Sequence, residues 1–160
     1  MGFALPDLSR LPKHVAIIGD NLLEHGSGER HAHIYPANGR TTRELTLAGK
    51  TDVDAAVIAA RAALPQWQGM PGNKRRDLLL KLADLLERSN AELQALSTIE
   101  NGSPTMRAGY MGPVAAERFR YYAGWTDKIT GDTLSAWNGP AHNYVTCEPY
   151  GVIGAIIPWN

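Results

Sequence analysis

Asn160, the last residue of the chain, is the side chain whose position suggests chemistry most directly. It follows an uninterrupted apolar run over residues 151–157, which is typical of a strand buried on both faces of a parallel α/β sheet. In open sheets of this kind, ligands bind beyond the carboxyl ends of the strands. Pro158, Trp159 and Asn160 are therefore expected beside a ligand, where the NH₂ group of an Asn can hold an oxyanion without changing its protonation state.

Cys147 is the one cysteine of the chain, and its thiol is a candidate nucleophile. It stands in a predicted strand, and no base lies near it in the sequence. A thiol without an activating neighbour is a weak nucleophile at neutral pH, so catalysis by Cys147 is disfavoured. A single cysteine also excludes an internal disulfide and fits a reducing compartment.

The segment Gly-Lys-Thr at 49–51 resembles the end of a phosphate-binding loop. That motif also needs a glycine five residues before Gly49, and the position holds Glu44. A helix cap at Thr51 is therefore the better interpretation of this segment.

His25, His31 and His33 stand close together in a polar stretch. The sequence supplies no matching set of carboxylates or thiols, and protein zinc sites draw on three or four such ligands. Solvated loop histidines are the better interpretation, and no metal site is predicted.

The elements that must position these residues begin with short strands. Residues 14–19 favour a strand, and residues 22–28 favour a turn. Asn38-Gly39 is a strong hairpin signal because both residues tolerate positive φ. Residues 42–47 would then form the returning strand.

A first helix is predicted from Thr51, which can cap it with Asp54 reaching back, and Pro65 is expected to end it. A second, long helix follows a turn at residues 71–73, carries an apolar stripe of leucines and ends at residues 101–102, Asn-Gly.

A third helix is predicted from Pro113 to Gly131, with one or two turns before it over residues 105–110. Beyond it, residues 138–140 (Asn-Gly-Pro) favour a turn, and residues 144–148 favour a strand with alternating faces.

The composition is that of a soluble globular chain of 160 residues, with 44% hydrophobic and 20% charged residues. Lys and Arg number 16, as do Asp and Glu, so neither nucleic acid nor an anionic membrane is favoured as a partner. The longest apolar run, residues 152–158, is far shorter than the roughly 20 residues of a membrane helix. The N-terminus lacks the pattern of a secretory signal, so a cytoplasmic or organelle-matrix protein is expected.

The end of the chain carries a specific family pattern. Residues 148–160 match every fixed position of E-P-x-G-V-x-x-x-I-x-P-W-N. On this string the chain resembles the NAD(P)-dependent aldehyde dehydrogenases, and it is identified as an N-terminal fragment of such an enzyme that ends at the Pro-Trp-Asn motif. The resemblance covers about residues 33–160, with departures at Tyr35, where the family usually has Asn, and at Cys147, where a basic residue is common. Further stretches resemble the family in the same order along the chain: residues 52–57, 59–63, 67, 78–86, 101–104 and 119–131.

The resemblance implies oxidation of an aldehyde to a carboxylic acid with NAD or NADP. In the family reaction a cysteine thiolate attacks the aldehyde carbonyl, hydride passes to the nicotinamide, and a glutamate activates water that hydrolyses the thioester. By resemblance, Asn160 is the oxyanion donor of the catalytic site, and the residues of the cofactor cleft are Ile156, Ile157, Pro158 and Trp159. The nucleophile and base of the family lie outside residues 1–160, so the isolated chain is expected to be inactive.

The implied fold is α/β: N-terminal strands, three helices, an oligomerisation hairpin and the first strand of a Rossmann-like cofactor domain. The expected parts are residues 1–131 (strands and helices), 132–150 (the hairpin, turning near residues 139–140) and 151–160 (the first strand of an incomplete dinucleotide-binding sheet). The hairpin implies a homodimer or homotetramer of the full protein. An alternative function is an inactive short chain that binds or caps an intact dehydrogenase subunit.

Overall fold

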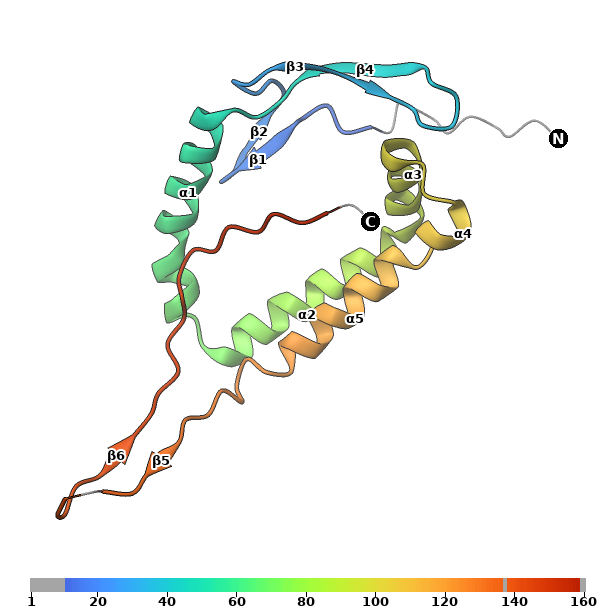
Figure 1. Ribbon diagram of the computed structural model, residues 1–160. Helices are drawn as coiled ribbons and strands as arrows, with labels where there is room; N and C mark the ends of the chain where they lie inside the picture. Colours follow the sequence, from blue (N-terminus) through green and yellow to red (C-terminus); the bar gives the residue numbers. More distant parts are fainter. Residues whose placement is uncertain (1–10, 137, 159–160) are drawn as a thin grey trace.

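The computed structural model describes residues 11–136 and 138–158, which form an open frame of helices and hairpins (Figure 1). Within these residues the strands pair as three antiparallel hairpins: β1 (Ala16–Ile18) with β2 (Asn21–Leu23), β3 (Arg30–Ile34) with β4 (Thr41–Thr46), and β5 (Thr133–Leu134) with β6 (Asn143–Tyr144). The helices are α1 (Lys50–Gly69), α2 (Gly72–Arg88), α3 (Asn90–Asn101), α4 (Thr105–Ala108) and α5 (Met111–Ala123).

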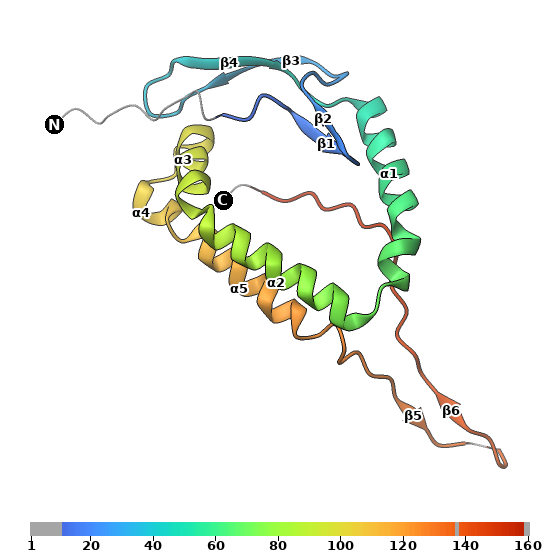
Figure 2. The same ribbon diagram turned by 180° about the vertical axis from the view of Figure 1, so that it is seen from behind.

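The two N-terminal hairpins and α1 form one side of the frame, and the α2–α5 pair forms the other (Figures 1 and 2). The β5–β6 hairpin projects away from both. The segment after β6 returns along α1 and then crosses the middle of the frame, between β1–β2 and the α2–α5 pair, in both views.

The β3–β4 hairpin forms at the predicted Asn-Gly pair. Gly39 has a φ of +70°, whereas Asn38 keeps a negative φ. The turn closes through bonds from the Tyr35 N–H to the Arg40 carbonyl at 2.8 Å and from the Gly39 N–H to the Tyr35 carbonyl at 2.9 Å. The Tyr35 residue is only 8% exposed, so it belongs to the core.

The turn predicted for residues 22–28 is partly wrong. It begins later, because residues 21–23 pair with 16–18 as β2, with Ala16 opposite Leu23. Gly19, at a φ of +58°, makes the tight connection between these two strands. The predicted strand over residues 14–19 is confirmed in its central part, β1.

Helix α1 is capped differently from the prediction. Gly49 is the N-cap, and Asp52, not Asp54, reaches back to accept the Gly49 N–H at 2.8 Å. The same carboxylate accepts the backbone N–H and the hydroxyl of Ser27, each at 2.7 Å. These bonds lower the pKa of Asp52, the Ser27 backbone bond most, and they tie the start of α1 to the β2–β3 loop.

The predicted end of this helix at Pro65 is also wrong, because α1 continues to Gly69. Proline removes one N–H donor from a helix but leaves the following turn free to form. Here Arg75 of α2 donates to the Met70 carbonyl at 2.5 Å and to the Gln68 carbonyl at 3.4 Å. A cation on the last carbonyls stabilises that extra turn.

The long second helix of the prediction is two helices in the structure. Helix α2 ends at Arg88, Ser89 adopts φ −87° and ψ +7°, and α3 starts at Asn90. The Asn90 side chain donates to the Gly109 carbonyl at 2.8 Å and accepts the Gly112 N–H at 3.1 Å. Ser and Asn side chains compete with helical backbone bonds, and these tertiary bonds fix the break. The predicted stop is confirmed, since Gly102 has a φ of +73°.

The α2–α5 pair packs through small residues. Ala83 of α2 and Ala116 and Ala123 of α5 are buried, which lets the two backbones approach closely. Arg120 of α5 then reaches across to α2, to the carboxylates of Asp84 at 2.9 Å and Glu87 at 2.8 Å.

The third predicted helix is shorter than expected. It starts at Met111, close to the predicted Pro113, and the extra turn before it forms as α4, but α5 ends at Ala123 rather than at Gly131. The chain then makes turns before entering β5. The β5–β6 hairpin turns at Gly139, as predicted, with a φ of +86°.

In the described part of the chain, no helix has the length and apolar character needed to cross a membrane.

Candidate active-site segment

The segment over residues 148–158 leads to the predicted site residues. Gly151, at a φ of +95°, stands where the segment passes α1, and a Cβ added there would lie 3.6 Å from the Leu64 side chain. From Gly151 onward the chain runs through the middle of the frame toward residue 158 (Figure 1).

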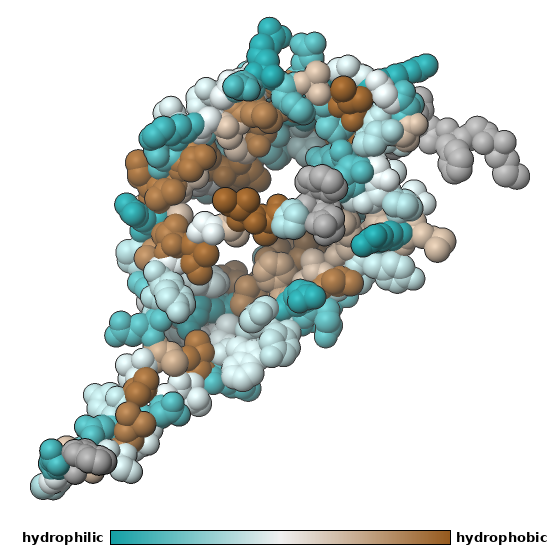
Figure 3. All heavy atoms as spheres, viewed as in Figure 1, coloured by the Kyte–Doolittle hydropathy of each residue, from teal (hydrophilic) through white to brown (hydrophobic). Residues whose placement is uncertain are grey.

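The predicted buried strand over residues 151–157 is not formed in this chain. Residues 152–158 carry no strand pairing and are exposed, with Ile156 at 103% and Ile157 at 82% exposure. Figure 3 shows openings on both sides of this segment, bordered by hydrophobic side chains. A strand needs neighbours for its backbone bonds, and no described strand lies beside it, so its apolar residues stay in solvent.

The site residues named from the sequence fall into two groups. Ile156, Ile157 and Pro158 lie together at the end of the described segment, all exposed. Trp159 and Asn160 lie outside the described residues.

Cys147 lines a groove together with residues that include Trp67, Arg75, Asp127 and Glu148. Its thiol donates to the Thr130 carbonyl at 3.4 Å and, among the described residues, has no hydrogen bond to a base. The geometry therefore gives Cys147 no activating partner, in line with the sequence interpretation.

Asp127 is the most strongly paired acid of that groove. Lys128 donates to it at 2.8 Å, and Arg76 lies at 3.6 Å. The bond from Lys128 is the main cause of the lowered pKa of Asp127, so this carboxylate is held ionised and is a poor proton acceptor.

The segment at 49–51 begins α1 and has no phosphate-loop geometry. Gly49 is the helix N-cap, and the Lys50 ammonium pairs with Asp54 at 2.6 Å on the helix surface. The capping interpretation of this segment is correct in kind, although Gly49 takes the role that was predicted for Thr51.

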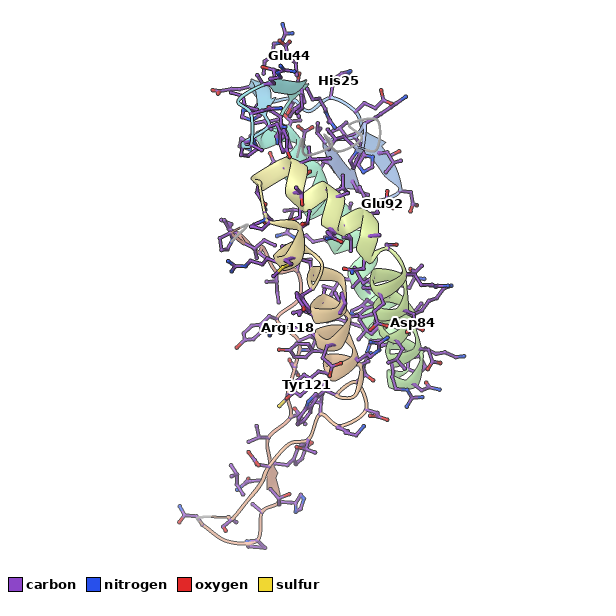
Figure 4. All side chains as sticks on the ribbon, turned by 90° about the vertical axis from the view of Figure 1, so that its right-hand side faces the viewer. His25, Glu44, Asp84, Glu92, Arg118 and Tyr121 are labelled. Atoms are coloured by element: carbon purple, nitrogen blue, oxygen red, sulfur yellow. The ribbon has the colours of Figure 1, made fainter. Side chains whose placement is uncertain are left out.

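The loop interpretation of the histidines needs correction. His31 and His33 lie in β3. Of the three histidines only His25 lies in a loop, and it is exposed at the end of the molecule that carries the β3–β4 hairpin (Figure 4). His33 is half-buried, with Nδ1 2.5 Å from the Thr42 hydroxyl and Nε2 3.1 Å from the Glu100 carbonyl, so it links β3 to α3. Within residues 11–136 and 138–158, no group of His, Cys, Asp and Glu gathers in a metal-binding arrangement.

Two polar clusters were not anticipated from the sequence. They are the Ser27–Asp52 cluster at the start of α1 and the Arg120–Asp84–Glu87 cluster across α2 and α5. Hydrogen bonds from Arg120 lower the pKa of Glu87, and the two carboxylates raise that of Arg120. Asp84 and Glu87 are three residues apart, so the sequence could have placed both carboxylates on one face of the helix. The pairing of Asp52 with Ser27, 25 residues away in a loop, has no comparable sequence pattern.

A model of the aldehyde dehydrogenase family matches residues 23–160. The chain belongs to the aldehyde dehydrogenase family. The chain is 47% identical over 128 residues to the putative aldehyde dehydrogenase DhaS of Bacillus subtilis, a match that covers 78% of this chain and 26% of DhaS. It is 39% identical over 153 residues to retinal dehydrogenase 2 of Homo sapiens, covering 92% of this chain and 29% of that protein.

Solved structures share the fold, among them an aldehyde dehydrogenase from Bacillus cereus, with a TM-score of 0.72 at 33% identity over 82% of this chain and 27% of that chain. A structure of PnpE in complex with nicotinamide adenine dinucleotide superposes with a TM-score of 0.71 at 31% identity, over 78% of this chain and 26% of PnpE. The predicted α/β part of an aldehyde dehydrogenase fold is therefore confirmed. The chain spans only about a quarter to three tenths of the length of these relatives.

Proposed function

We propose that this chain supplies the oxyanion donor and one wall of the cofactor cleft to an enzyme that oxidises an aldehyde to a carboxylic acid with NAD or NADP. The observation that carries the proposal is the family match through residue 160, which ends on the complete Pro-Trp-Asn motif. The enzyme is a protein of the length of its relatives, of which these residues form the N-terminal part.

Asn160 acts on the charge that develops at the aldehyde oxygen. When a cysteine thiolate from elsewhere in the enzyme attacks the carbonyl, the oxygen becomes negative, and the Asn160 NH₂ group donates a hydrogen bond to it. A fixed neutral donor of this kind stabilises the transition state more than the ground state. The cysteine and the glutamate that hydrolyses the thioester belong to the remainder of the enzyme.

A bound nicotinamide cofactor would supply the acceptor for the hydride that leaves the substrate carbon. The residues present suit one wall of its cleft: Ile156 and Ile157 offer bare aliphatic side chains on an unpaired backbone, and ligand clefts are lined mainly by such groups. Ile156, Ile157, Pro158 and Trp159 would hold one face of the cofactor. The described helices supply no glycine-rich phosphate turn, so the pyrophosphate and ribose contacts come from further βα units.

The exposed surface of the chain supports its incorporation into a larger unit. It amounts to 12819 Å², whereas a compact monomer of 17.4 kDa exposes about 7,900 Å² by the usual scaling of area with mass. Apolar side chains such as Ile58 of α1 and Leu78 of α2 remain in solvent. The remaining sheet of the cofactor domain would pair with residues 151–157 and cover these faces. The proposed parts of the chain remain residues 1–131, 132–150 and 151–160.

The β5–β6 hairpin is the proposed contact for a homodimer or homotetramer. It projects from the frame (Figure 1), and Leu134 and Tyr144 on it are exposed. A two-stranded ribbon with open edges is marginal alone and gains stability when a partner covers it.

A single exposed thiol, Cys147, fits a reducing compartment, and we place the enzyme in the cytoplasm.

Replacement of Asn160 tests the proposed function. In the enzyme of full length, Asn160→Ala is expected to lower kcat by about a hundred- to a thousandfold, since one oxyanion donor is removed. Steady-state NAD(P)H formation with a simple aldehyde measures it. Asn21→Ala, at an exposed position of β2, is the matched control and should keep wild-type turnover. An unchanged kcat in a folded Asn160→Ala variant would refute the assigned role.

A further inference from the structure

Three Asn-Gly pairs occur in the chain, at residues 38–39, 101–102 and 138–139. In such a pair the backbone nitrogen of the glycine can attack the side-chain carbonyl carbon of the Asn, because glycine offers little steric resistance. The reaction needs a backbone nitrogen that is free to move and an Asn side chain that is free to rotate. The three pairs differ in both respects.

The first two pairs are held in place. In the β3–β4 turn, the Gly39 N–H donates to the Tyr35 carbonyl at 2.9 Å, and Asn38 Oδ1 accepts the Arg40 N–H at 3.0 Å. Both bonds must break before Asn38 can react.

At the end of α3, the Gly102 N–H donates to the Thr98 carbonyl at 3.1 Å. Asn101 Oδ1 accepts the Ser103 N–H at 3.0 Å and the Ser103 hydroxyl at 2.6 Å. Packing adds to this restraint, because a Cβ placed on Gly102 would lie only 3.1 Å from Pro36.

The third pair is exposed and is not held by hydrogen bonds within the described residues. Asn138 and Gly139 lie in the exposed turn of the β5–β6 hairpin, at the end farthest from the frame (Figure 1). Among the described residues, neither takes part in a hydrogen bond, and nothing lies within 4 Å of a Cβ built on Gly139. Both the attacking nitrogen and the Asn138 side chain are therefore unrestrained by that part of the chain.

We propose that Asn138 is a site of spontaneous deamidation in the native protein, and that Asn38 and Asn101 are protected by the fold. The Gly139 nitrogen forms a bond to Cγ of Asn138, the Cγ–Nδ2 bond breaks, and ammonia leaves with the proton from the Gly139 N–H. Water then opens the cyclic imide at either carbonyl and yields aspartate or isoaspartate. No oxidant or cofactor takes part.

The product changes the charge and the backbone of the hairpin turn. One neutral amide becomes a carboxylate, so the formal net charge of the chain falls from 0 to −1. The isoaspartate form also adds a methylene to the main chain between β5 and β6. The inference is independent of the proposed catalysis. The proposed oligomer contact covers Leu134 and Tyr144 on the paired strands, and the inference rests on the turn beyond them staying exposed.

Peptide mass mapping of the protein, aged in mildly alkaline buffer, tests the proposal. In the native protein, conversion of Asn138 from amide to acid is expected at least about tenfold faster than conversion of Asn38 or Asn101, whose hydrogen bonds must first open. In denaturant the three rates should approach one another. A native rate at Asn38 or Asn101 equal to that at Asn138 would overturn the proposal, as would the same tenfold order in denaturant.

Two variants separate the sites by charge. Asn138→Gln should abolish the more acidic species that accumulates in the native protein, because Gln cannot form the five-membered ring. Asn38→Gln, the matched control in the turn of the β3–β4 hairpin, should leave that species unchanged. Persistence of the acidic species in Asn138→Gln would assign it to another residue and overturn the proposal.

Discussion

Close backbone approach at Gly112 fixes how α3 and α5 meet. The Gly112 N–H donates to Asn90 Oδ1 at 3.1 Å, while the Asn90 amide donates to Gly109 at 2.8 Å. A Cβ at Gly112 would lie 2.7 Å from Asn90 Oδ1 and 2.8 Å from the Leu86 carbonyl. Asn90 and Gly112 thus act together, and neither is recognisable from local sequence, because the partners are 22 residues apart.

Gly112→Ala should lower the free energy of unfolding by about 1–3 kcal/mol, the usual cost of forcing a methyl group into a filled contact. Urea denaturation followed by circular dichroism measures the loss. Gly69→Ala is the control, since nothing lies within 4 Å of its Cβ position at the end of α1. It should be neutral or slightly stabilising, and an equal loss in both variants would contradict the steric explanation.

At the scale of elements, the sequence predicted correctly those turns and helix ends that depend on hydrogen bonds between neighbouring residues. The hairpin at Asn38-Gly39 and the stop at Gly102 follow from glycine's access to positive φ. The break at Ser89 and the passage of α1 through Pro65 were mispredicted, because the bonds that decide them come from α5 and α2. An apolar stripe has the same period in one helix as in two consecutive ones, so it could not reveal the break.

The contact between α2 and α5 carries a pH dependence. Arg120 holds the pKa of Glu87 below its ordinary value of 4.5. The unfolded chain therefore binds more protons than the native chain just below that value, and stability rises with pH there. The contribution of Glu87 is present above about pH 4.5 and is lost as the pH falls through the lower, native pKa.

Glu87→Gln should accordingly lower the thermal midpoint at neutral pH, and the difference from wild type should shrink below pH 4.5. Differential scanning fluorimetry across this range measures it. Glu117→Gln, at an exposed position of α5, is the control and should keep the thermal midpoint of the wild type. A Glu87→Gln difference that grows on acidification would contradict the assigned ion pair.

At the scale of the whole molecule, the chain is an open frame around a segment that has no strand partner. The apolar run at 151–157 predicted a buried strand, and that prediction is wrong for this chain because the described residues contain no sheet that could bury it. The candidate site at Ile156–Asn160 is a proposal from the sequence and the family likeness, and its last two residues lie outside the described part of the chain.

The most direct test is aldehyde-dependent NAD(P)H formation by the 160-residue chain, measured beside the enzyme of full length. The account predicts turnover by the full-length enzyme and no turnover above the protein-free rate by the chain, because the nucleophile and base are supplied elsewhere. Turnover by the chain that survives Cys147→Ser would contradict the account, and turnover that this substitution abolishes would contradict the inert role assigned to Cys147.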